Sequence, residues 1–364
     1  MNRRTLLISL AGLPALAAAA DLKERRLLYV ATPGIRNYLE YGGVGVLVFD
    51  IEQGHRFVKR IPTFGEVPGV EAENVKGICA SARTGRLYVS TIKRLLCLDL
   101  VTEKPHWNRA YDGGCDRMSI SPNGKVIYLP SLEKEFWNVI DAATGDVITK
   151  ITTNSGAHNT VYGGDGSRVY LGGLKSPYLF VADTRSHTAE TKVGPFGGAI
   201  RPFTVNGAQT LAYVCVNDLL GFEIGDLSSG KLLHRIEIPG FKPGPVKRHG
   251  CSSHGVGLTP DEREVWVCDA FNERVHVFDN RTLPPRYVTS LKVRDQPGWV
   301  TFSIDGKYAY PSTGEVFETK SKQLAAALVD EQGRPVHSEK LLEITFREGK
   351  PRRNGDQFGI GRQH

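Results

Sequence analysis

The chain repeats one short pattern seven times, and this repetition constrains its fold more than any other feature. Each copy is a run of β-branched and aromatic residues around one large aromatic side chain, and six copies follow a small or polar turn. SPNGKVIYL (121–129) and TPDEREVWV (259–267) are two examples. The aromatic side chains lie between 40 and 59 residues apart, as expected for propeller blades. They are Tyr29, Tyr88, Tyr128, Tyr170, Tyr213, Trp266 and Tyr310.

A second marker follows the same period. In six repeats an aspartate ends an apolar run, usually just before a turn: Asp50, Asp99, Asp141, Asp183, Asp226 and Asp279. Carboxylates at this position accept hydrogen bonds from turn N–H groups, so we expect these residues to cap turns rather than to act as catalytic acids. Each repeat then reads as four short antiparallel strands. The sequence therefore predicts an all-β fold, a seven-bladed β-propeller of four-stranded antiparallel blades.

The first repeat begins at Tyr29 and lacks an inner strand. KLLEITF (340–346) follows the strands of the last repeat and is predicted to be the innermost strand of blade 1. Pairing the C-terminal strand with the N-terminal one removes the open sheet edges of the ring. We therefore expect a single propeller domain over residues 21–364, with residues 347–364 as a tail.

SPNGKVIYL and TPDEREVWV resemble the repeats of the YVTN-repeat seven-bladed β-propeller family, which is close to the quinoprotein amine dehydrogenase-like and lactonase-like propellers. The resemblance covers residues 22–346 and implies the propeller fold. It implies no single activity, because propellers host many chemistries.

The N-terminus has the layout of a signal peptide over residues 1–20. Arg3 and Arg4 precede an apolar run that ends in small residues, which predicts cleavage near Ala20 and a periplasmic or secreted protein. The arginine pair favours twin-arginine translocation over an ordinary secretory route. No later segment approaches the roughly 20 apolar residues of a membrane span, so no transmembrane anchor is expected.

Charge and cysteine usage narrow the function classes. Removing residues 1–20 lowers the formal charge from +7 to +5, and no basic stripe or recognisable module accompanies it, which argues against nucleic-acid binding. The six cysteines show no CxxC or Cys/His metal spacing. In an oxidising compartment a bridge from Cys251 to Cys215 or Cys268 is predicted, the alternative being buried free thiols.

The residues that open the inner strands should face a common funnel at the channel mouth. Counting back from the turn of each repeat brings two histidines, His158 and His254, into one register, and we take these as candidate catalytic residues. The same register, its neighbours and the loops on the same face give the candidate ligand-binding residues: Lys76, Asp116, Arg117, Asn159, Arg201, Asn217, Asp269 and Trp299. The long basic loop 241–253 is a candidate binding loop or lid.

Three functions fit this funnel. The one favoured here is binding of a small anionic molecule or saccharide acid at the basic mouth. The second is a lyase or lactone hydrolase in which His158 and His254 are the acid and base and Arg201 stabilises negative charge. The third is a scaffold for a periplasmic redox partner protein. No cofactor motif is present, although a divalent metal held by His158, His254 and Asp116 is an alternative.

Overall fold

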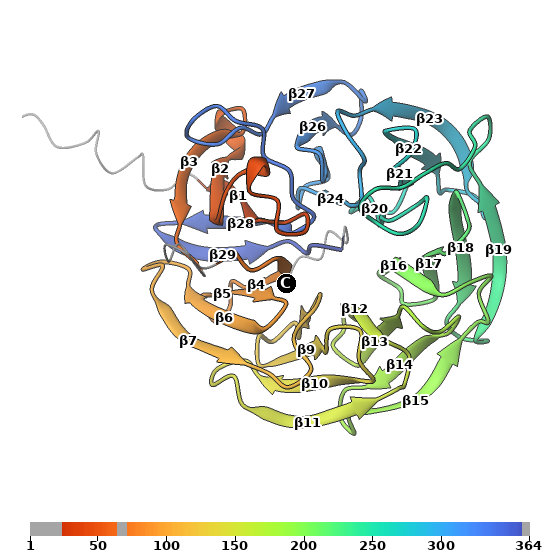
Figure 1. Ribbon diagram of the computed structural model, residues 1–364, viewed down its shortest axis with the longest axis horizontal. Helices are drawn as coiled ribbons and strands as arrows, with labels where there is room; N and C mark the ends of the chain where they lie inside the picture. The colour runs from red at the N-terminus through yellow and green to blue at the C-terminus, as the bar shows by residue number, and fades with distance from the viewer. Residues whose placement is uncertain (1–23, 64–70, 359–364) are drawn as a thin grey trace, which may run out of the picture.

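The computed structural model describes residues 24–63 and 71–358. Seven antiparallel sheets stand in a ring around a central channel, which confirms the predicted seven-bladed propeller (Figure 1). Short 3₁₀ turns at Leu39–Tyr41 (η1) and Ile51–Gln53 (η2) are the helical elements of the described residues. Within those residues, no helix has the length and apolar character that crossing a membrane requires. The predicted signal peptide, residues 1–20, lies outside the described part of the chain.

Blades 2 to 7 each contain four strands, numbered from the channel outward. Blades 2 to 4 are β4 (Val75–Ser81), β5 (Arg86–Thr91), β6 (Arg94–Asp99), β7 (Pro105–Ala110); β8 (Ser119–Ile120), β9 (Val126–Pro130), β10 (Phe136–Asp141), β11 (Val147–Thr152); and β12 (Ala157–Tyr162), β13 (Arg168–Gly173), β14 (Leu179–Asp183), β15 (Thr188–Val193). Blades 5 to 7 are β16 (Ile200–Val205), β17 (Leu211–Val216), β18 (Gly221–Asp226), β19 (Lys231–Glu237); β20 (Val256–Leu258), β21 (Glu264–Asp269), β22 (Arg274–Asp279), β23 (Arg286–Lys292); and β24 (Val300–Phe302), β25 (Tyr308–Pro311), β26 (Glu315–Glu318), β27 (Leu324–Ala327).

The repeated aromatic residues occupy the second strand of blades 2 to 7 and, in blade 1, β1 (Arg25–Thr32), and they are fully buried. Several of these phenols also reach the next blade. The Tyr88 hydroxyl donates to the Ala142 carbonyl over 2.9 Å, and that of Tyr213 donates to Asn280 over 3.0 Å. A buried tyrosine needs a partner for its hydroxyl, and here that partner joins neighbouring blades. The periodic aromatic position therefore fastens one blade to the next.

The repeated aspartates end the third strands and cap the turns that follow, as predicted. Asp141 Oδ1 accepts hydrogen bonds from the N–H groups of Ala143 and Thr144 at 2.8 and 3.0 Å. Asp50, Asp99, Asp183, Asp226 and Asp279 each cap their own turn in the same way. These carboxylates are structural.

Blade 1 closes the ring with both ends of the chain. Its order is β29 (Lys350–Asn354), β28 (Leu341–Arg347), β1 (Arg25–Thr32), β2 (Gly45–Asp50) and β3 (Arg56–Ile61). The predicted pairing of the C-terminal strand with the Tyr29 strand is confirmed, with Tyr29 opposite Leu342. Figure 1 shows these blue C-terminal strands joined to the red N-terminal blade. The prediction that 340–346 is innermost was wrong, because β29 adds a fifth strand on that side.

The segment after β29 contacts other blades across the channel. Gln357 accepts a hydrogen bond from Ile78 N–H over 3.1 Å and donates one to the Met118 carbonyl, also over 3.1 Å. Phe358 packs edge-on against Trp299, with ring centroids 5.6 Å apart. Part of the predicted tail therefore plugs the channel below its mouth.

All six cysteines are buried and none is disulfide-bonded, so the predicted Cys251 bridge is not present. The Cys251 thiol instead donates to the Ser253 carbonyl over 3.1 Å. Burial raises the pKa of the Cys215 thiol to about 12, which keeps it protonated and apolar in character.

Candidate functional site

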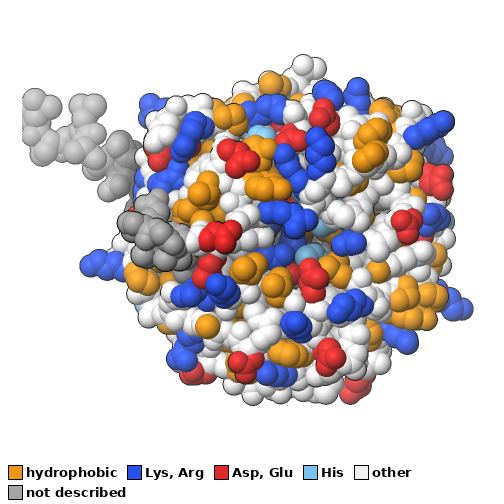
Figure 2. All heavy atoms as spheres, in the orientation of Figure 1, with side chains coloured by type: hydrophobic (Ala, Val, Ile, Leu, Met, Phe, Trp, Pro, Cys, Tyr) orange, Lys and Arg blue, Asp and Glu red, His pale blue; other side chains and the backbone are white. Residues whose placement is uncertain are grey.

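A cavity of about 190 Å³ lies at one mouth of the channel, where the segments that lead into the inner strands meet. Figure 2 shows Lys, Arg and His side chains gathered at the centre of this face. Its walls carry six cationic side chains and two carboxylates. The cations are Arg36, Lys76, Arg117, Arg201, Arg248 and Lys340; the carboxylates are Glu133 and Glu339; three histidines, His158, His249 and His254, complete the charged and titratable lining.

His158 is held between two charged groups. Its Nδ1 lies 2.7 Å from Asp116 Oδ2, and its Nε2 lies 3.0 Å from Arg117 Nη1. Because arginine only donates hydrogen bonds, Nε2 is the acceptor. Nδ1 therefore carries the proton and donates a hydrogen bond to Asp116. Burial lowers the pKa of His158, and Asp116 offsets this only in part. His158 is therefore a neutral imidazole with both nitrogens already engaged.

Asp116 is fully buried behind His158, and Lys76 Nζ lies 3.5 Å from its second oxygen. Burial by itself raises the pKa of this carboxyl, but His158, Lys76 and Arg117 together outweigh burial and lower it. Asp116 is therefore an ionised carboxylate that orients His158 and Lys76.

Glu339 lies in the opposite wall and contacts several charged and titratable side chains. Its Oε2 accepts a short hydrogen bond from Arg117 Nη2 and another, at 2.7 Å, from Lys340 Nζ. Burial alone raises the pKa of Glu339, yet Lys340, Arg117 and His249 hold it well below its usual value. Burial lowers the pKa of Lys340 to about 7, against the opposing effect of Glu339. A buried carboxylate is tolerable here because cations surround it.

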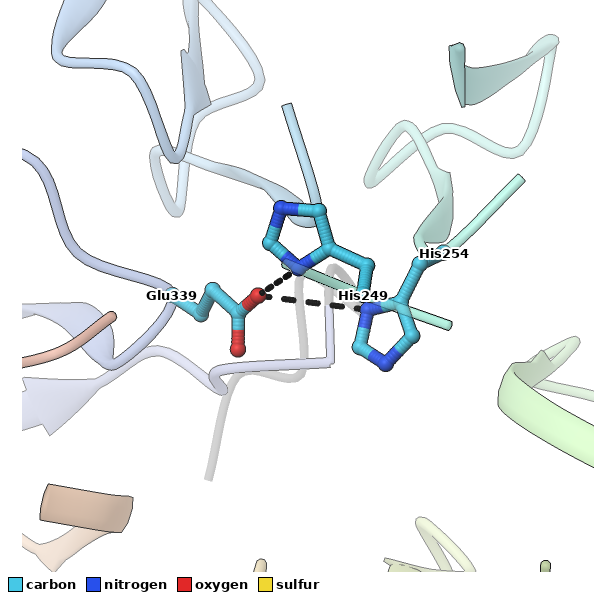
Figure 3. Close-up of side chains that lie close together, drawn as sticks. All are labelled: His249, His254 and Glu339. Carbon is cyan, nitrogen blue, oxygen red and sulfur yellow. Dashed lines mark ion pairs between the residues drawn. The ribbon is translucent and has the colours of Figure 1, made fainter. Parts of the chain in front are cut away.

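Two more histidines approach Glu339 from the long loop (Figure 3). His249 Nδ1 lies 3.0 Å from Glu339 Oε1, and His254 Nδ1 lies 3.9 Å from the same oxygen. The two rings stack with centroids 5.1 Å apart. His254 Nδ1 also lies 3.0 Å from the Gly298 carbonyl. Burial lowers the pKa of His254 well below its usual value, so this ring is neutral.

The loop that carries His249 is held in place by Arg248, the residue before this histidine. Arg248 donates from Nη1 to Asp295 over 2.5 Å and from Nη2 to the Tyr41 hydroxyl over 2.6 Å. Its guanidinium also lies over the Tyr41 ring, 5.0 Å from the centroid. Arg248 therefore ties the loop to blade 1 and to the segment before blade 7, which fixes His249 rather than leaving it on an open lid.

The sequence-predicted residues divide into two groups. Lys76, Arg117, His158, Arg201 and His254 line the one cavity, as expected, with Asp116 directly behind. Four others do not line it: Asn159, Asn217, Asp269 and Trp299.

Three residues of the second group make other contacts, and Asn159 is buried beside Arg117. Asn217 accepts a hydrogen bond from Arg201 Nε over 2.5 Å and so orients that guanidinium. Asp269 accepts a hydrogen bond from the Asn272 side chain and lies 3.1 Å from His276 Nε2. Trp299 lies beneath Arg117, whose guanidinium carbon is 4.9 Å from the ring centroid.

Sequence reasoning missed Glu339 and Lys340. They directly precede β28, which pairs with the Tyr29 strand as the inner strands of the other blades pair with their aromatic strands. The register rule that found His158 and His254 was applied to the repeats with turns and not to this closing segment. The strand pairing shows the equivalence: Glu339 precedes Leu342, the partner of Tyr29, by as many residues as His158 precedes Val161, the partner of Tyr170.

A larger hollow of about 540 Å³ lies between blades 1 and 2 and has a mixed lining that includes Arg25, Lys59, Asp50 and Glu52. Asp50 is committed to capping its turn there. Since no histidine lines this hollow, we place the candidate site at the channel mouth.

No protein-family model matches the chain, and neither does any curated protein. The family resemblance of the repeats therefore stays a prediction. Among solved structures, 1545 chains match. One is hydrazine synthase from Kuenenia stuttgartiensis, at 12% identity and a TM-score of 0.46, covering 71% of this chain and 98% of that one. We take no functional argument from a likeness of this degree.

Proposed function

We propose that this protein binds a small anionic ligand in the mouth cavity. The observation that carries the proposal is the charge of the lining, where six cationic side chains face two carboxylates. Both oxygens of Glu339 are already engaged by Arg117, Lys340 and His249. Asp116 and Asp295 pair with Lys76 and Arg248 behind the wall, whereas the ion pairs of the described residues include neither Arg36 nor Arg201. The remaining positive charge favours an anion, and clefts with low-dielectric walls strengthen such a field.

The cavity also limits the size of the ligand. At about 190 Å³ it is smaller than the roughly 300–1,000 Å³ of sites for drug-sized molecules. A compact carboxylate, a sugar acid or an inorganic oxyanion suits this volume. Arg201 is the best-placed group for it, because Asn217 and the Gly250 carbonyl orient the guanidinium at the cavity wall. An oriented guanidinium can donate two parallel hydrogen bonds to a carboxylate.

Binding is better supported than acid–base catalysis. A general base needs a free lone pair within reach of its proton. The lone pair of His158 Nε2 already accepts from Arg117. His254 donates from Nδ1 to the Gly298 carbonyl and keeps its Nε2 lone pair, but burial lowers the pKa of this ring well below its usual value, which makes it a weak base. This proposal therefore gives the histidines a positioning role.

A thermal-shift panel tests the proposal. Phosphate, sulfate, lactate, citrate and gluconate are compared at low salt, with glucose as the uncharged match for gluconate. At least one anion should raise the melting temperature in a concentration-dependent way, and added NaCl should weaken the effect. If no anion has an effect, or if glucose acts as strongly as gluconate, the proposal fails.

Export belongs to the same proposal. The signal peptide predicted for residues 1–20 would place the binding site in the periplasm or outside the cell. The mass of the protein recovered from that compartment should correspond to cleavage near Ala20. A mature protein that retains Arg3 and Arg4 would contradict it.

A further inference from the structure

We propose that His249, His254 and Glu339 hold a divalent transition-metal ion of the zinc class at the wall of the mouth cavity. Within the described residues these three side chains offer one ligand atom each, all within 4.8 Å of one another. Two imidazoles and one carboxylate form a ligand set that suits first-row divalent ions. The inference goes beyond anion binding and does not depend on it.

The distance between His249 and Glu339 is that of two atoms that share one ion, and the distance from His254 is longer. With metal–ligand bonds of about 2.1 Å, two ligand atoms lie ~3.0 Å apart at a right angle and ~3.4 Å apart in a tetrahedron. His249 Nδ1 and Glu339 Oε1 are 3.0 Å apart, and His254 Nδ1 is 3.9 Å from that oxygen. Small side-chain rotations bring all three atoms onto one centre.

The surroundings orient the ligands. His249 Nε2 lies 3.2 Å from the Gln296 carbonyl, and donation there leaves the Nδ1 lone pair directed at Glu339. Glu339 Oε2 is held by Arg117 and Lys340, which leaves Oε1 for the histidine side. Metal-binding histidines and carboxylates in proteins are oriented by outer partners of this kind.

Without a cation between them, a neutral His249 and an ionised Glu339 cannot satisfy all of their hydrogen-bonding atoms. Both nitrogens of His249 face oxygen acceptors, the Gln296 carbonyl on one side and Glu339 on the other. A neutral imidazole has one donor nitrogen only. Either a second proton or a metal ion must therefore occupy the contact between Nδ1 and Oε1. The metal fits better, because His254 Nδ1 converges on the same point.

Gly298 completes the site. A side chain there would come within 2.5 Å of Glu339 Oε1 and His249 Nδ1, so only glycine lets these atoms approach. Its carbonyl lies 3.0 Å from His254 Nδ1 and would supply a fourth ligand atom, after the two nitrogens and the carboxylate oxygen. Metal binding through His254 Nδ1 displaces the proton that this nitrogen otherwise donates to the carbonyl.

The set predicted from sequence, His158 with His254 and Asp116, is less suited to a metal. Both ring nitrogens of His158 are hydrogen-bonded, Nδ1 to Asp116 and Nε2 to Arg117. A metal would have to break one of these contacts and leave a buried charge without its partner. The two sets share His254 and differ in His158 and His249, so variants can separate them.

The experiment uses the full chain, stripped with a chelator and titrated with Co²⁺, whose visible absorption reports nitrogen and oxygen ligation. Bound Co²⁺ should reach one per chain and be displaced by Zn²⁺. His249→Ala and Glu339→Gln should each weaken binding by more than the roughly 10–100-fold lost when an orienting partner is removed. His158→Gln should retain binding, and so should His106→Ala, which changes an exposed histidine on β7.

Zn²⁺ should also raise the melting temperature of the wild type and leave that of Glu339→Gln unchanged. Glu339→Gln keeps the shape of the side chain but removes the charge that Arg117 and Lys340 face, so His249→Ala, which leaves those ion pairs intact, provides the test if Glu339→Gln does not fold. The proposal is overturned if the wild type binds no Co²⁺, if both variants bind as the wild type does, or if only His158→Gln loses the ion.

Discussion

Arg117 donates a hydrogen bond from Nη1 to His158 Nε2 over 3.0 Å, so the nitrogen that a catalytic histidine would use is already occupied. The same guanidinium donates from Nη2 to Glu339, which links the two walls of the cavity. Arg117 is only 3% exposed. It therefore acts as a buried connector between an imidazole and a carboxylate rather than as a free ligand-binding arginine.

Replacing this connector should destabilise the fold. Arg117→Ala leaves Glu339 buried with fewer partners, and breaking a buried ion pair costs about 3–5 kcal/mol. The free energy of unfolding in urea should fall by that amount with an unchanged m-value. Arg201→Ala, which removes a half-buried arginine from the same cavity, is the matched control and should change stability little. Equal stability of wild type and Arg117→Ala would contradict the connector role.

We expect two C-terminal truncations to reduce the stability of the fold to different degrees. Deleting residues 349–364 removes β29 and the plug but keeps β28 paired with β1. Loss of the buried Phe358 alone costs about 1.5–3 kcal/mol, so unfolding should remain cooperative at a lower melting temperature. Deleting residues 339–364 also removes β28 and should cause aggregation or loss of cooperative unfolding. Calorimetry that finds the longer deletion melting like the full chain would refute this closure.

We expect protonation of His55 to contribute to the loss of folding stability at low pH. Its Nε2 lies 3.1 Å from the Tyr310 hydroxyl, and burial, with Arg26 and Lys307 adding to it, lowers the pKa of His55 from 6.5 to about 4. Between these values the unfolded chain binds a proton that the folded chain does not, so stability falls as pH falls from 6.5 to 4. The loss approaches ~3 kcal/mol at about 1.4 kcal/mol per pH unit.

His55→Asn removes this titration and tolerates the left-handed backbone at the site, where φ is 62°. Urea unfolding at pH 7 and pH 4.5 should therefore show a smaller drop in stability for the variant than for the wild type. Parallel pH profiles for the two proteins would exclude His55 as the source.

Gly298→Ala tests the close approach on the wall opposite Asp116. The added methyl group meets His249 Nδ1 and Glu339 Oε1, so the histidine must move away from the carboxylate. Overpacking of this kind costs about 1–3 kcal/mol. A crystal structure of the variant should show a longer distance between His249 Nδ1 and Glu339 Oε1. An unchanged 3.0 Å contact at wild-type stability would show that the wall is not tightly packed.

The repeat pattern was enough to predict the ring, because each marker has one structural cause. The tyrosines fasten neighbouring blades, and aspartates such as Asp141 cap the turns between strands. The register of the inner strands also brought His158, Arg201 and His254 to one cavity. A period in the sequence can carry this information since every blade repeats the same geometry.

Contacts between different blades could not be predicted in the same way. Among the neighbours of the register positions, Arg117 lines the cavity whereas Asn159 and Trp299 do not, so the register alone does not decide which neighbour faces the mouth. Partners such as Arg117 and Glu339 lie 222 residues apart and meet only when the ring closes. No local pattern encodes that meeting. The plug at Gln357 and Phe358 escaped notice for the same reason.

Isothermal titration of wild type and Arg201→Ala, with the anion that gives the largest thermal shift, tests the binding site most directly. The wild type should bind one anion per chain, and Arg201→Ala should lose about 2–4 kcal/mol of binding free energy without a change in stability. Arg185→Ala, which removes an exposed arginine between β14 and β15, should bind like the wild type. Equal affinity of Arg201→Ala and wild type would place the anion outside this cavity and contradict the proposed function.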